Sequence, residues 1–415
     1  MKQMIVSCDP KETRMALLDE GQLVEFASER SAVKGIAGNF YKGKVMNVLP
    51  GIQAAFVDIG QKKNGFLYID DVLHPHMDKQ PRVKPNIADL LHPGQELIVQ
   101  VTKEPSGSKG AKLTTHYSLP GRWLVYMPYA DYIAVSKKVS TEQERSRLRH
   151  LGERLRDNEE GVILRTVAEG EQDEAIENDM LTLRHIWHRI EAEAERQRPP
   201  AELHRDLGLV ERMIRDVFHP EADRFITDDP QCATVAESFL QRISSADIQP
   251  AVEIYREREP IFAHLGVEER LHHDFQRKIW LEGGSYIVWD QTEALTVIDV
   301  NTGKFTGGAT LEETVTRTNI LAAQSIARLL RLRDTGGIII IDFIDMDHES
   351  SRHAVVDALE QVLLQDRTKT HIVGWTRLGL LELTRKKARE ETISFAFQTC
   401  SVCHGTGKIA SWIKD

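Results

Sequence analysis

Cysteine is scarce in this sequence of 415 residues, which contains four. Their irregular spacing argues against a disulfide framework and indicates a reducing, cytoplasmic compartment. Long apolar runs are also missing: the strongest candidate, residues 338–341, stops at Asp342 and falls far short of the ~18 residues of a membrane span. Charged side chains occur from Lys2 onward, which leaves no apolar region typical of a signal peptide. We therefore expect a cytoplasmic protein without an integral membrane segment.

An excess of positive charge is missing as well. The chain has 53 Lys and Arg against 63 Asp and Glu, a formal net charge of −10, which taken alone argues against a nucleic-acid partner. Residues 38–115 depart from this average, with 10 basic and 7 acidic residues and hence a net charge of +3. Hydrophobic residues make up 41% of the chain, enough for packed cores, and the length predicts two to four domains at ~100–200 residues each.

Turn residues and hydrophobic periodicity divide the chain into segments of different character. Residues 38–115 contain five short β-branched or aromatic runs separated by Gly, Pro and Asn, which predicts a small β-barrel. Charged helices are expected at 141–157 and 172–198. In the last third, strands alternate with helices, and Thr310 and Glu313 form a capping box, so an α/β layer is predicted. The strands there cover 286–289, 295–300, 338–343 and 371–375, and the helices 310–334 and 350–365.

Carboxylates end two of these apolar strands. Asp299 and Asn301 are two residues apart, so both side chains project to one side of their strand, and Asp342 ends the run of four isoleucines. Active sites in α/β sheets gather at such strand ends, and two carboxylates suit Mg²⁺, which can prepare a water for attack on a phosphodiester. The alternative is that these residues only cap turns. Asp345 is expected to cap the following helix.

The sequence from Cys400 to Cys403 is a Cys-x-x-Cys motif followed by glycines, which is half of a structural zinc site. Either a second chain supplies the missing pair of ligands, or the motif is a redox dithiol; His404 is an awkward third ligand because it adjoins Cys403. Cys8 and Cys232 stand alone in apolar surroundings and are expected to be core thiols.

Aromatic and basic residues of the predicted barrel form a third group. Phe56 and Phe66 lie on neighbouring strand candidates, and Lys103, Lys109 and Lys112 cluster around a Gly/Ser-rich turn. Aromatic faces that stack bases, beside lysines that meet phosphates, are typical of single-strand binding by OB-folds. The alternative is that the two phenylalanines belong to the barrel core.

Two basic features complete the candidates. Arg165 and Thr166 follow an apolar strand, where a guanidinium and a hydroxyl could grip a terminal phosphate or where Arg165 could form a surface salt bridge. Five basic residues between 377 and 389 could form a solvated helix face or a surface that steers phosphates.

Taken together, these motifs resemble the ribonuclease E/G family. The resemblance rests on residues 296–301, 331–334, 336–346 and 400–407, and on the earlier stretches 41–44, 54–58 and 65–67. It implies an α/β (α+β multidomain) fold: an RNase H-like scaffold with an inserted OB-fold RNA-binding domain and 5′-sensor region, a DNase-I-like catalytic subdomain and a C-terminal zinc link. The implied ranges are 1–37 and 207–278 for the scaffold, 38–118 for the OB-fold, 119–206 for the sensor, 279–397 for the catalytic subdomain and 398–415 for the zinc link.

The resemblance also implies roles for individual residues. Asp299 and Asp342 match Mg²⁺ ligands, and Asn301 matches their hydrogen-bonding companion. Cys400 and Cys403 match a zinc link to which two chains each give one cysteine pair, which implies a homodimer. The RNA-contacting positions are Phe56, Phe66 and Lys109, to which Lys112 is added from the pattern above, and the 5′-monophosphate pocket is matched by Arg165 and Thr166.

The implied activity is a Mg²⁺-dependent, single-strand-specific endoribonuclease, stimulated by a 5′-monophosphate and leaving 5′-phosphate and 3′-hydroxyl ends, in rRNA processing and mRNA decay. The alternative functions are a non-catalytic RNA-binding scaffold held as a zinc-linked dimer and an Hsp40-type chaperone cofactor. The carboxylates alone do not exclude DNA as the substrate. Ser401 stands where the family has proline, and the sequence ends eight residues after Gly407. Formation of a tetramer, which the family assigns to a further domain, is therefore left open.

Overall fold

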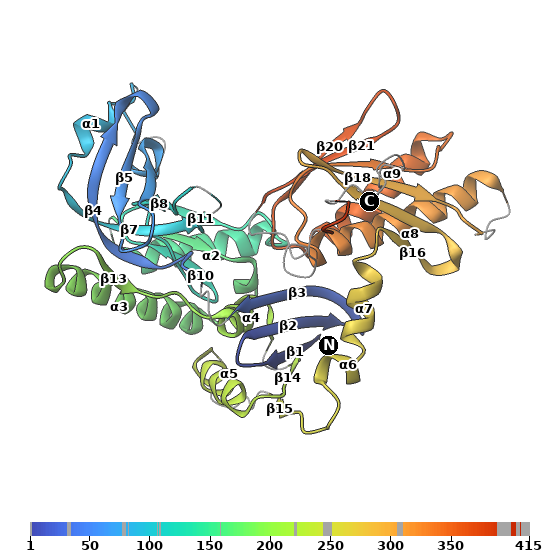
Figure 1. Cartoon of the computed structure of the whole chain (residues 1–415), viewed down its shortest axis with the longest axis horizontal. Helices are drawn as coiled ribbons and strands as arrows, with labels where there is room; N and C mark the ends of the chain where they lie inside the picture. The colour runs from blue at the N-terminus through green and yellow to red at the C-terminus, as the bar shows by residue number, and fades with distance from the viewer. Residues whose placement is uncertain are drawn as a thin grey trace. The chain divides into compact units, whose positions relative to one another are not determined.

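The computed structural model describes residues 2–30, 35–76, 80–81, 83–105, 107, 109–157, 159–219, 222–243, 251–304, 310–387, 400–403 and 407. The chain divides into two compact units (Figure 1). One unit combines Met1–Ala32 with Phe218–Asp415, and the other is Val33–Val217. The predicted mixed α/β architecture with a small barrel is confirmed.

The Val33–Val217 unit begins with the barrel. Its sheet has the strand order β13-β4-β5-β6-β8-β7, and β7 also pairs with β4, which closes the sheet on itself. The strands are β4 (Phe40–Leu49), β5 (Ala54–Asp58), β6 (Gly65–Tyr68), β7 (Glu96–Lys103), β8 (Lys112–Thr114) and β13 (Ala201–His204). Alternate residues such as Val57, Leu67 and Leu113 fill the interior, as the period of two in a strand requires. A short helix, α1 (Ile87–Leu90), lies between β6 and β7 in the chain.

A second sheet in the same unit has the order β11-β12-β10-β9. Its strands are β9 (Leu119–Pro120), β10 (Leu124–Met127), β11 (Ile133–Val135) and β12 (Gly161–Leu164), and its helices are α2 (Glu142–Leu155) and α3 (Asp173–Arg196). Both helices were predicted, and both bury an apolar stripe against the sheet, for example Leu148 of α2 and Ile176 of α3. A further helix, α4 (Leu209–Val217), ends the unit.

The other unit contains a sheet of order β15-β14-β1-β2-β3. Its strands are β1 (Lys2–Cys8), β2 (Glu12–Asp19), β3 (Gln22–Arg30), β14 (Arg224–Thr227) and β15 (Ala251–Ile254), and the helices after β14 are α5 (Pro230–Ile243), α6 (Ile261–His264) and α7 (Val267–Asp274). Cys232 is buried, as expected for a core thiol, whereas Cys8 is half-buried, and the two are not isolated from each other. They share a side-chain hydrogen bond that, together with burial, raises the pKa of Cys232, because the parallel pairing of β1 with β14 brings the start of α5 to the end of β1.

The last sheet carries the predicted carboxylates and has the order β16-β17-β18-β19-β21-β20. Its strands are β16 (Lys278–Trp280), β17 (Tyr286–Gln291), β18 (Leu295–Asn301), β19 (Gly337–Asp342), β20 (Thr370–Trp375) and β21 (Leu381–Arg385), with helices α8 (Leu311–Leu332) and α9 (Glu349–Leu363). The predicted alternation of strands and helices is therefore confirmed. As expected, Thr310 caps α8, because its Oγ1 accepts a hydrogen bond from the backbone N–H of Glu313 at 3.1 Å.

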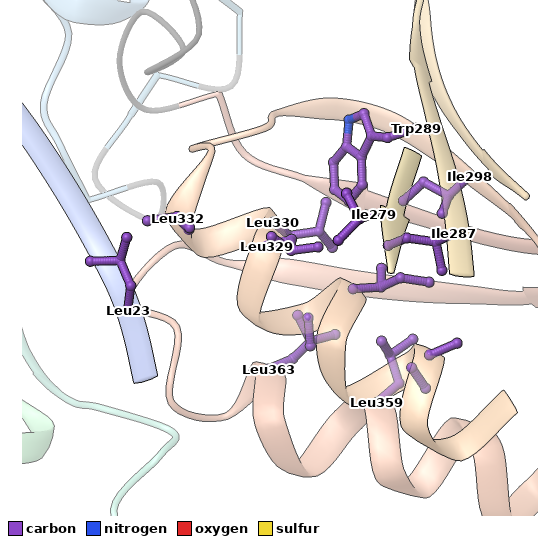
Figure 2. Close-up of a cluster of buried hydrophobic side chains, with 14 of the residues drawn as sticks. Leu23, Ile279, Ile287, Trp289, Ile298, Leu329, Leu330, Leu332, Leu359 and Leu363 are labelled. Atoms are coloured by element: carbon purple, nitrogen blue, oxygen red, sulfur yellow. The ribbon is translucent and has the colours of Figure 1, made fainter. Parts of the chain in front are cut away.

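One face of this sheet packs on the two helices. In Figure 2, Leu359 lies beneath Ile287 and Ile298 and Leu329 lies to their left, and all four are fully buried. The alternate residues of β18, among them Asp299 and Asn301, are exposed or half-buried on the opposite face. Helix packing thus decides which side of the sheet presents its polar side chains. Within the described ranges, no helix combines the length and apolar character needed to cross a bilayer.

Candidate functional site

Asp299, Asn301 and Asp342 lie together on the exposed face of the last sheet. Strands β18 and β19 are parallel neighbours, and Asp299 is the register partner of Asp342. Register partners on neighbouring parallel strands project to the same face, with their backbones roughly 4.8 Å apart. The side chain of Asn301 donates from Nδ2 to Oδ2 of Asp299 at 2.8 Å. The structure therefore brings the three predicted residues into one group.

The electrostatics of this group favour a bound cation. Partial burial, together with the negative charges of Asp299 and Asp345, raises the pKa of Asp342 above its ordinary value. A divalent cation between the two carboxylates would remove this repulsion. Carboxylate and amide oxygens are ligands for hard cations, and Mg²⁺ is commonly held by one or two protein carboxylates while it keeps several waters. The two aspartates fit such an ion, although among the described residues no three His, Cys, Asp or Glu side chains gather.

The expectation for Asp345 is wrong. The N-cap of α9 is His348, and its side chain makes no capping hydrogen bond. The start of this helix is instead held by Glu312 of α8, which accepts hydrogen bonds from the backbone N–H of Asp347 at 3.2 Å and from the hydroxyl of Ser351 at 2.7 Å. Asp345 is exposed and contributes negative potential at Asp342. A carboxylate from another helix thus replaces the local cap that sequence reasoning favoured.

Asn319 is a positioning residue that the sequence analysis did not identify. It lies on α8 with no exposed surface, donates from Nδ2 to the carbonyl oxygen of Ile344 at 2.8 Å, and accepts from the backbone N–H of Ile344 at 3.1 Å. This pair of bonds holds the segment that leaves the sheet just after Asp342. The available signal was an amide within the apolar stripe that includes Val315 and Ile326, because such a buried amide must find partners.

Cys400 and Cys403 have local geometry compatible with a metal ligand pair. The Sγ of Cys400 accepts hydrogen bonds from the backbone N–H groups of Cys403 and Val402, and these bonds lower the pKa of the Cys400 thiol. They favour the thiolate, which is the form that binds zinc. No further ligand joins the pair within the described ranges, and His404 lies outside them.

Three of the four predicted RNA-contacting residues, Phe56, Phe66 and Lys112, lie in one row across the barrel strands. Phe56 of β5 pairs with Phe66 of β6, with their ring centroids 5.9 Å apart and an interplanar angle of 71°. Phe66 pairs in turn with Lys112 of β8, which is opposite Lys103 of β7. Both phenylalanines are half-buried and neither belongs to the barrel core, so the structure favours a surface role for them. Lys109 is exposed, whereas the Nζ of Lys112 lies 2.8 Å from Oδ2 of Asp71.

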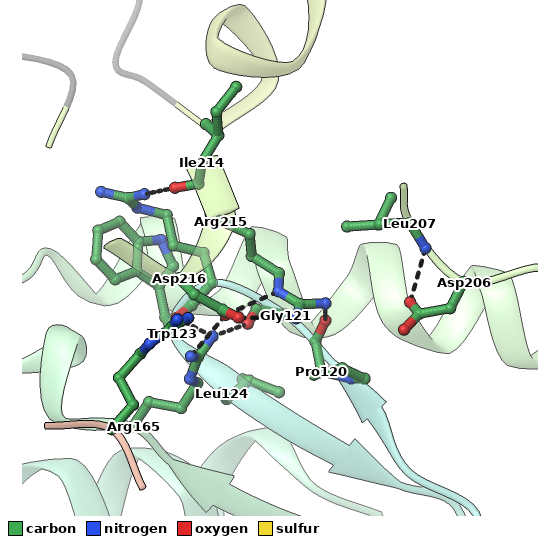
Figure 3. A network of polar contacts seen from close by, with 12 residues as sticks. Pro120, Gly121, Trp123, Leu124, Arg165, Asp206, Leu207, Ile214, Arg215 and Asp216 are labelled. Atoms are coloured by element: carbon green, nitrogen blue, oxygen red, sulfur yellow. Dashed lines mark hydrogen bonds and ion pairs between the residues drawn. The ribbon is translucent and has the colours of Figure 1, made fainter. Parts of the chain in front are cut away.

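Arg165 and Thr166 lie at the end of β12, where Arg165 already has protein partners (Figure 3). Its guanidinium donates to the carbonyl oxygen of Gly121 at 2.6 Å and to Oδ1 of Asp216 at 2.7 Å. The ion pair with Asp216 is largely buried, with side-chain exposures of 22% and 12%, so it is not the surface salt bridge considered from the sequence. The hydroxyl of Thr166 lies 2.8 Å from that of Ser136.

In the described part of the basic stretch, residues 377–387, the chain forms no helix. Arg385 lies on β21 with 3% of its surface exposed and forms ion pairs with Asp366 and Asp334 at 2.8 Å each. Lys386, which follows the strand, is exposed. The helical interpretation is therefore wrong for 381–385, and Arg389 lies outside the described residues. Positions 381, 383 and 385 of β21 are buried, which is the alternation of a strand. The sequence did not reveal this alternation because the third buried position is an arginine.

Comparison with known proteins agrees with these motifs over almost the whole chain. Residues 118–388 match the model of the ribonuclease E/G family. Ribonuclease G of Escherichia coli (strain K12) is 42% identical over 416 residues, covering 98% of this chain and 84% of that protein. Ribonuclease G of Haemophilus influenzae is 39% identical with the same coverage, and ribonuclease E of Nostoc is 40% identical over 89% of this chain and 54% of its own length. Family match and near full-length identity together show that this chain belongs to the ribonuclease E/G family.

Proposed function

We propose that this chain is a Mg²⁺-dependent endoribonuclease that cuts single-stranded RNA. The observation that carries the proposal is the register pairing of Asp299 with Asp342 on an exposed sheet face, with Asn301 bonded to Asp299. A purely structural role for the two aspartates would not require two like charges in adjacent positions, where they repel each other. Relatives with 39–42% identity over nearly the whole chain are named as ribonucleases.

Asp299 and Asp342 would hold the Mg²⁺ through their carboxylate oxygens. When bound, the ion lowers the pKa of a water and neutralises charge on the phosphodiester. The amide of Asn301 fixes the orientation of Asp299 by its hydrogen bond, and Asn319 fixes the backbone that follows Asp342. Attack of the water on phosphorus, with departure of the 3′ oxygen, leaves one 5′-phosphate and one 3′-hydroxyl end.

Preference for single strands follows from the barrel face. Phe56 and Phe66 can stack on bases only where those bases are unpaired, and Lys109 and Lys112 lie where they can meet the backbone phosphates. Lys112 would exchange its partner Asp71 for a phosphate. The +3 charge of residues 38–115 supports RNA binding at this face, although the whole chain has a net charge of −10.

Arg165 and Thr166 are proposed to hold the 5′-monophosphate of the substrate. The phosphate would compete with Asp216 for the guanidinium of Arg165, and Ser136 offers a second hydroxyl beside Thr166. A dianionic phosphate attracts a guanidinium more strongly than one carboxylate does, because it presents more charge and more acceptor oxygens. Occupation of this pocket would favour cleavage by restricting how the strand lies.

One experiment tests both the Mg²⁺-dependent cleavage and the preference for a 5′-monophosphate. The same single-stranded RNA is prepared with a 5′-monophosphate and with a 5′-hydroxyl, and cleavage is followed with Mg²⁺ and with EDTA. We expect Mg²⁺-dependent cleavage with 5′-phosphate and 3′-hydroxyl ends, faster on the monophosphorylated form. Binding of RNA without cleavage under any metal condition would instead indicate a non-catalytic scaffold, and equal cleavage of matched DNA would remove the specificity for RNA.

The variants Arg165→Ala and Asp216→Asn separate recognition of the 5′-phosphate from the effect of breaking the ion pair between these two residues. Arg165→Ala is expected to lower cleavage of the monophosphorylated RNA by ~10-fold or more and to leave the 5′-hydroxyl RNA nearly unchanged, as expected for loss of a charge-assisted bond. Asp216→Asn breaks the same ion pair but keeps the guanidinium, so it should retain the preference. An equal loss on both RNAs in Arg165→Ala would contradict the sensor role.

Cys400 and Cys403 are proposed to supply half of a zinc site that a second copy completes. Two ligands per chain are too few for structural zinc, which takes four N or S ligands in a tetrahedron. We expect half a zinc ion per chain by metal analysis, together with the mass of a dimer in solution. Cys400→Ser should abolish both, whereas one zinc ion per chain would contradict a shared site.

A further inference from the structure

An exposed aromatic pair lies at the edge of the catalytic sheet. Trp280 of β16 and Tyr286 of β17 are register partners with ring centroids 5.1 Å apart, and 49% of the surface of Trp280 remains exposed. The ammonium of Lys278 lies over both rings, 4.3 Å from the centroid of Trp280 and 3.8 Å from that of Tyr286. Trp280 therefore contacts Tyr286 and Lys278, yet about half of its surface remains open to a further partner.

Register places this pair on the same face as the carboxylates. Tyr286 pairs with Trp280 on one side and with Asn301 on the other, so the three side chains form a row across β16, β17 and β18. A second row runs from Lys278 through Val288 to Asp299 and Asp342. At ~4.8 Å between neighbouring strands, the backbone of Trp280 lies about 10 Å from that of Asn301.

Close backbone packing holds this row in place. Gly303, with φ of +58°, follows Asn301, and a Cβ at Gly303 would lie only 2.2 Å from the carbonyl oxygen of Gly284 in the β16–β17 connection. The loop that precedes Tyr286 and the turn that follows Asn301 therefore pack tightly against each other. The aromatic pair and the carboxylates therefore belong to one continuous face of the same sheet.

We propose that Trp280 and Tyr286 form a stacking subsite for the base of a nucleotide next to the scissile phosphate, with Lys278 positioned for that nucleotide's backbone phosphate. The inference rests on the proposed function, because it assumes that Asp299 and Asp342 mark the point of cleavage. A base is the ligand that an aromatic pair with an adjacent ammonium suits best: the rings offer π-faces, and the cation meets the phosphate. The subsite belongs to single-stranded RNA, because a paired base cannot reach the rings.

Base stacking can be measured without cleavage. Short single-stranded RNAs carrying 2-aminopurine at successive positions are bound to the Asp342→Asn protein in EDTA, and fluorescence quenching is recorded. In the Asp342→Asn background, we expect quenching at one position to disappear when Trp280→Leu is added and to return when Trp280→Phe is added instead. The control Val373→Ala, in the same background, changes an exposed apolar residue of edge strand β20 and should leave the quenching in place. Quenching that is the same with Leu, Phe and Trp at position 280 would overturn the proposal.

Steady-state kinetics on cleavable RNA then test whether the subsite contributes to binding of the substrate that is cut. Trp280→Leu should raise KM by ~5- to 100-fold with little change in kcat, and an abasic nucleotide at the quenched position should produce the same loss in wild type but none in Trp280→Leu. If wild type does not cleave, the proposed function fails while the quenching result stands. A change in solution mass in Trp280→Leu, with RNA binding unaltered, would identify the patch as a protein interface and overturn the subsite.

Discussion

Asp342→Asn is expected to lower kcat for RNA cleavage by at least ~10³-fold, because a substitution in the outer shell of a metal site already costs 10- to 100-fold and Asp342 is a proposed direct ligand. The fold should survive the change. Asp342 is exposed at the end of β19, and its carboxylate faces the like charge of Asp299. The measurement is single-turnover cleavage of a monophosphorylated RNA, accompanied by thermal unfolding of both proteins.

The raised pKa of Asp342 fixes the sign of the stability effect. A carboxyl whose pKa in the folded state exceeds its unfolded value costs stability when ionised, and the cost diminishes as the pH falls through the folded pKa. At neutral pH without metal, Asp342→Asn should therefore be as stable as wild type or slightly more stable. Added Mg²⁺ should raise the Tm of wild type but not that of the variant, because only a ligand that binds the folded state stabilises it.

Asp345→Asn is the matched control. It removes a nearby carboxylate that contributes to the potential at Asp342 but is not its register partner. We expect less than ~10-fold loss of activity and a retained response of Tm to Mg²⁺. Equal losses in both variants would show that bulk negative potential, and not a specific ligand pair, supports cleavage.

Arg385→Met is expected to destabilise its unit by about 3–5 kcal/mol, the range for removing one partner of a buried ion pair. Arg385 is 3% exposed and donates to Asp366, Asp334 and the carbonyl oxygen of Thr335 at 2.8–2.9 Å. It therefore fastens β21 to the segment after α8 and to the segment after α9. Methionine fills a similar volume but supplies no donor, so buried oxygens lose hydrogen bonds.

Urea unfolding followed by tryptophan fluorescence measures this loss. The double variant Arg385→Met/Asp366→Asn should recover part of the stability, because the buried negative charge is removed together with its partner. Lys386→Met, at the exposed neighbouring position, should change the free energy of unfolding by less than ~0.5 kcal/mol. A loss in Lys386→Met as large as that in Arg385→Met would contradict a role for burial.

Local patterns determined the elements on which the site stands. Alternating and continuous apolar runs located β18 and β19, Thr310 marked the start of α8, and each followed from a period or a cap that spans only a few residues. Asp299 and Asn301 share a side of β18 because strand geometry places residues two apart on one face. The proximity of Asp299 and Asn301 was predictable for the same reason.

Only the tertiary structure decided which elements are neighbours. The sequence does not encode locally that β18 and β19 pair in parallel, that Trp280 and Tyr286 extend the same face, or that Cys8 meets Cys232. It likewise gave no sign that Glu312 holds the start of α9 or that Arg385 is buried. Strand order and register arise from contacts between residues far apart in the chain. The helices that cover one face of the sheet select which side chains are buried and which remain exposed.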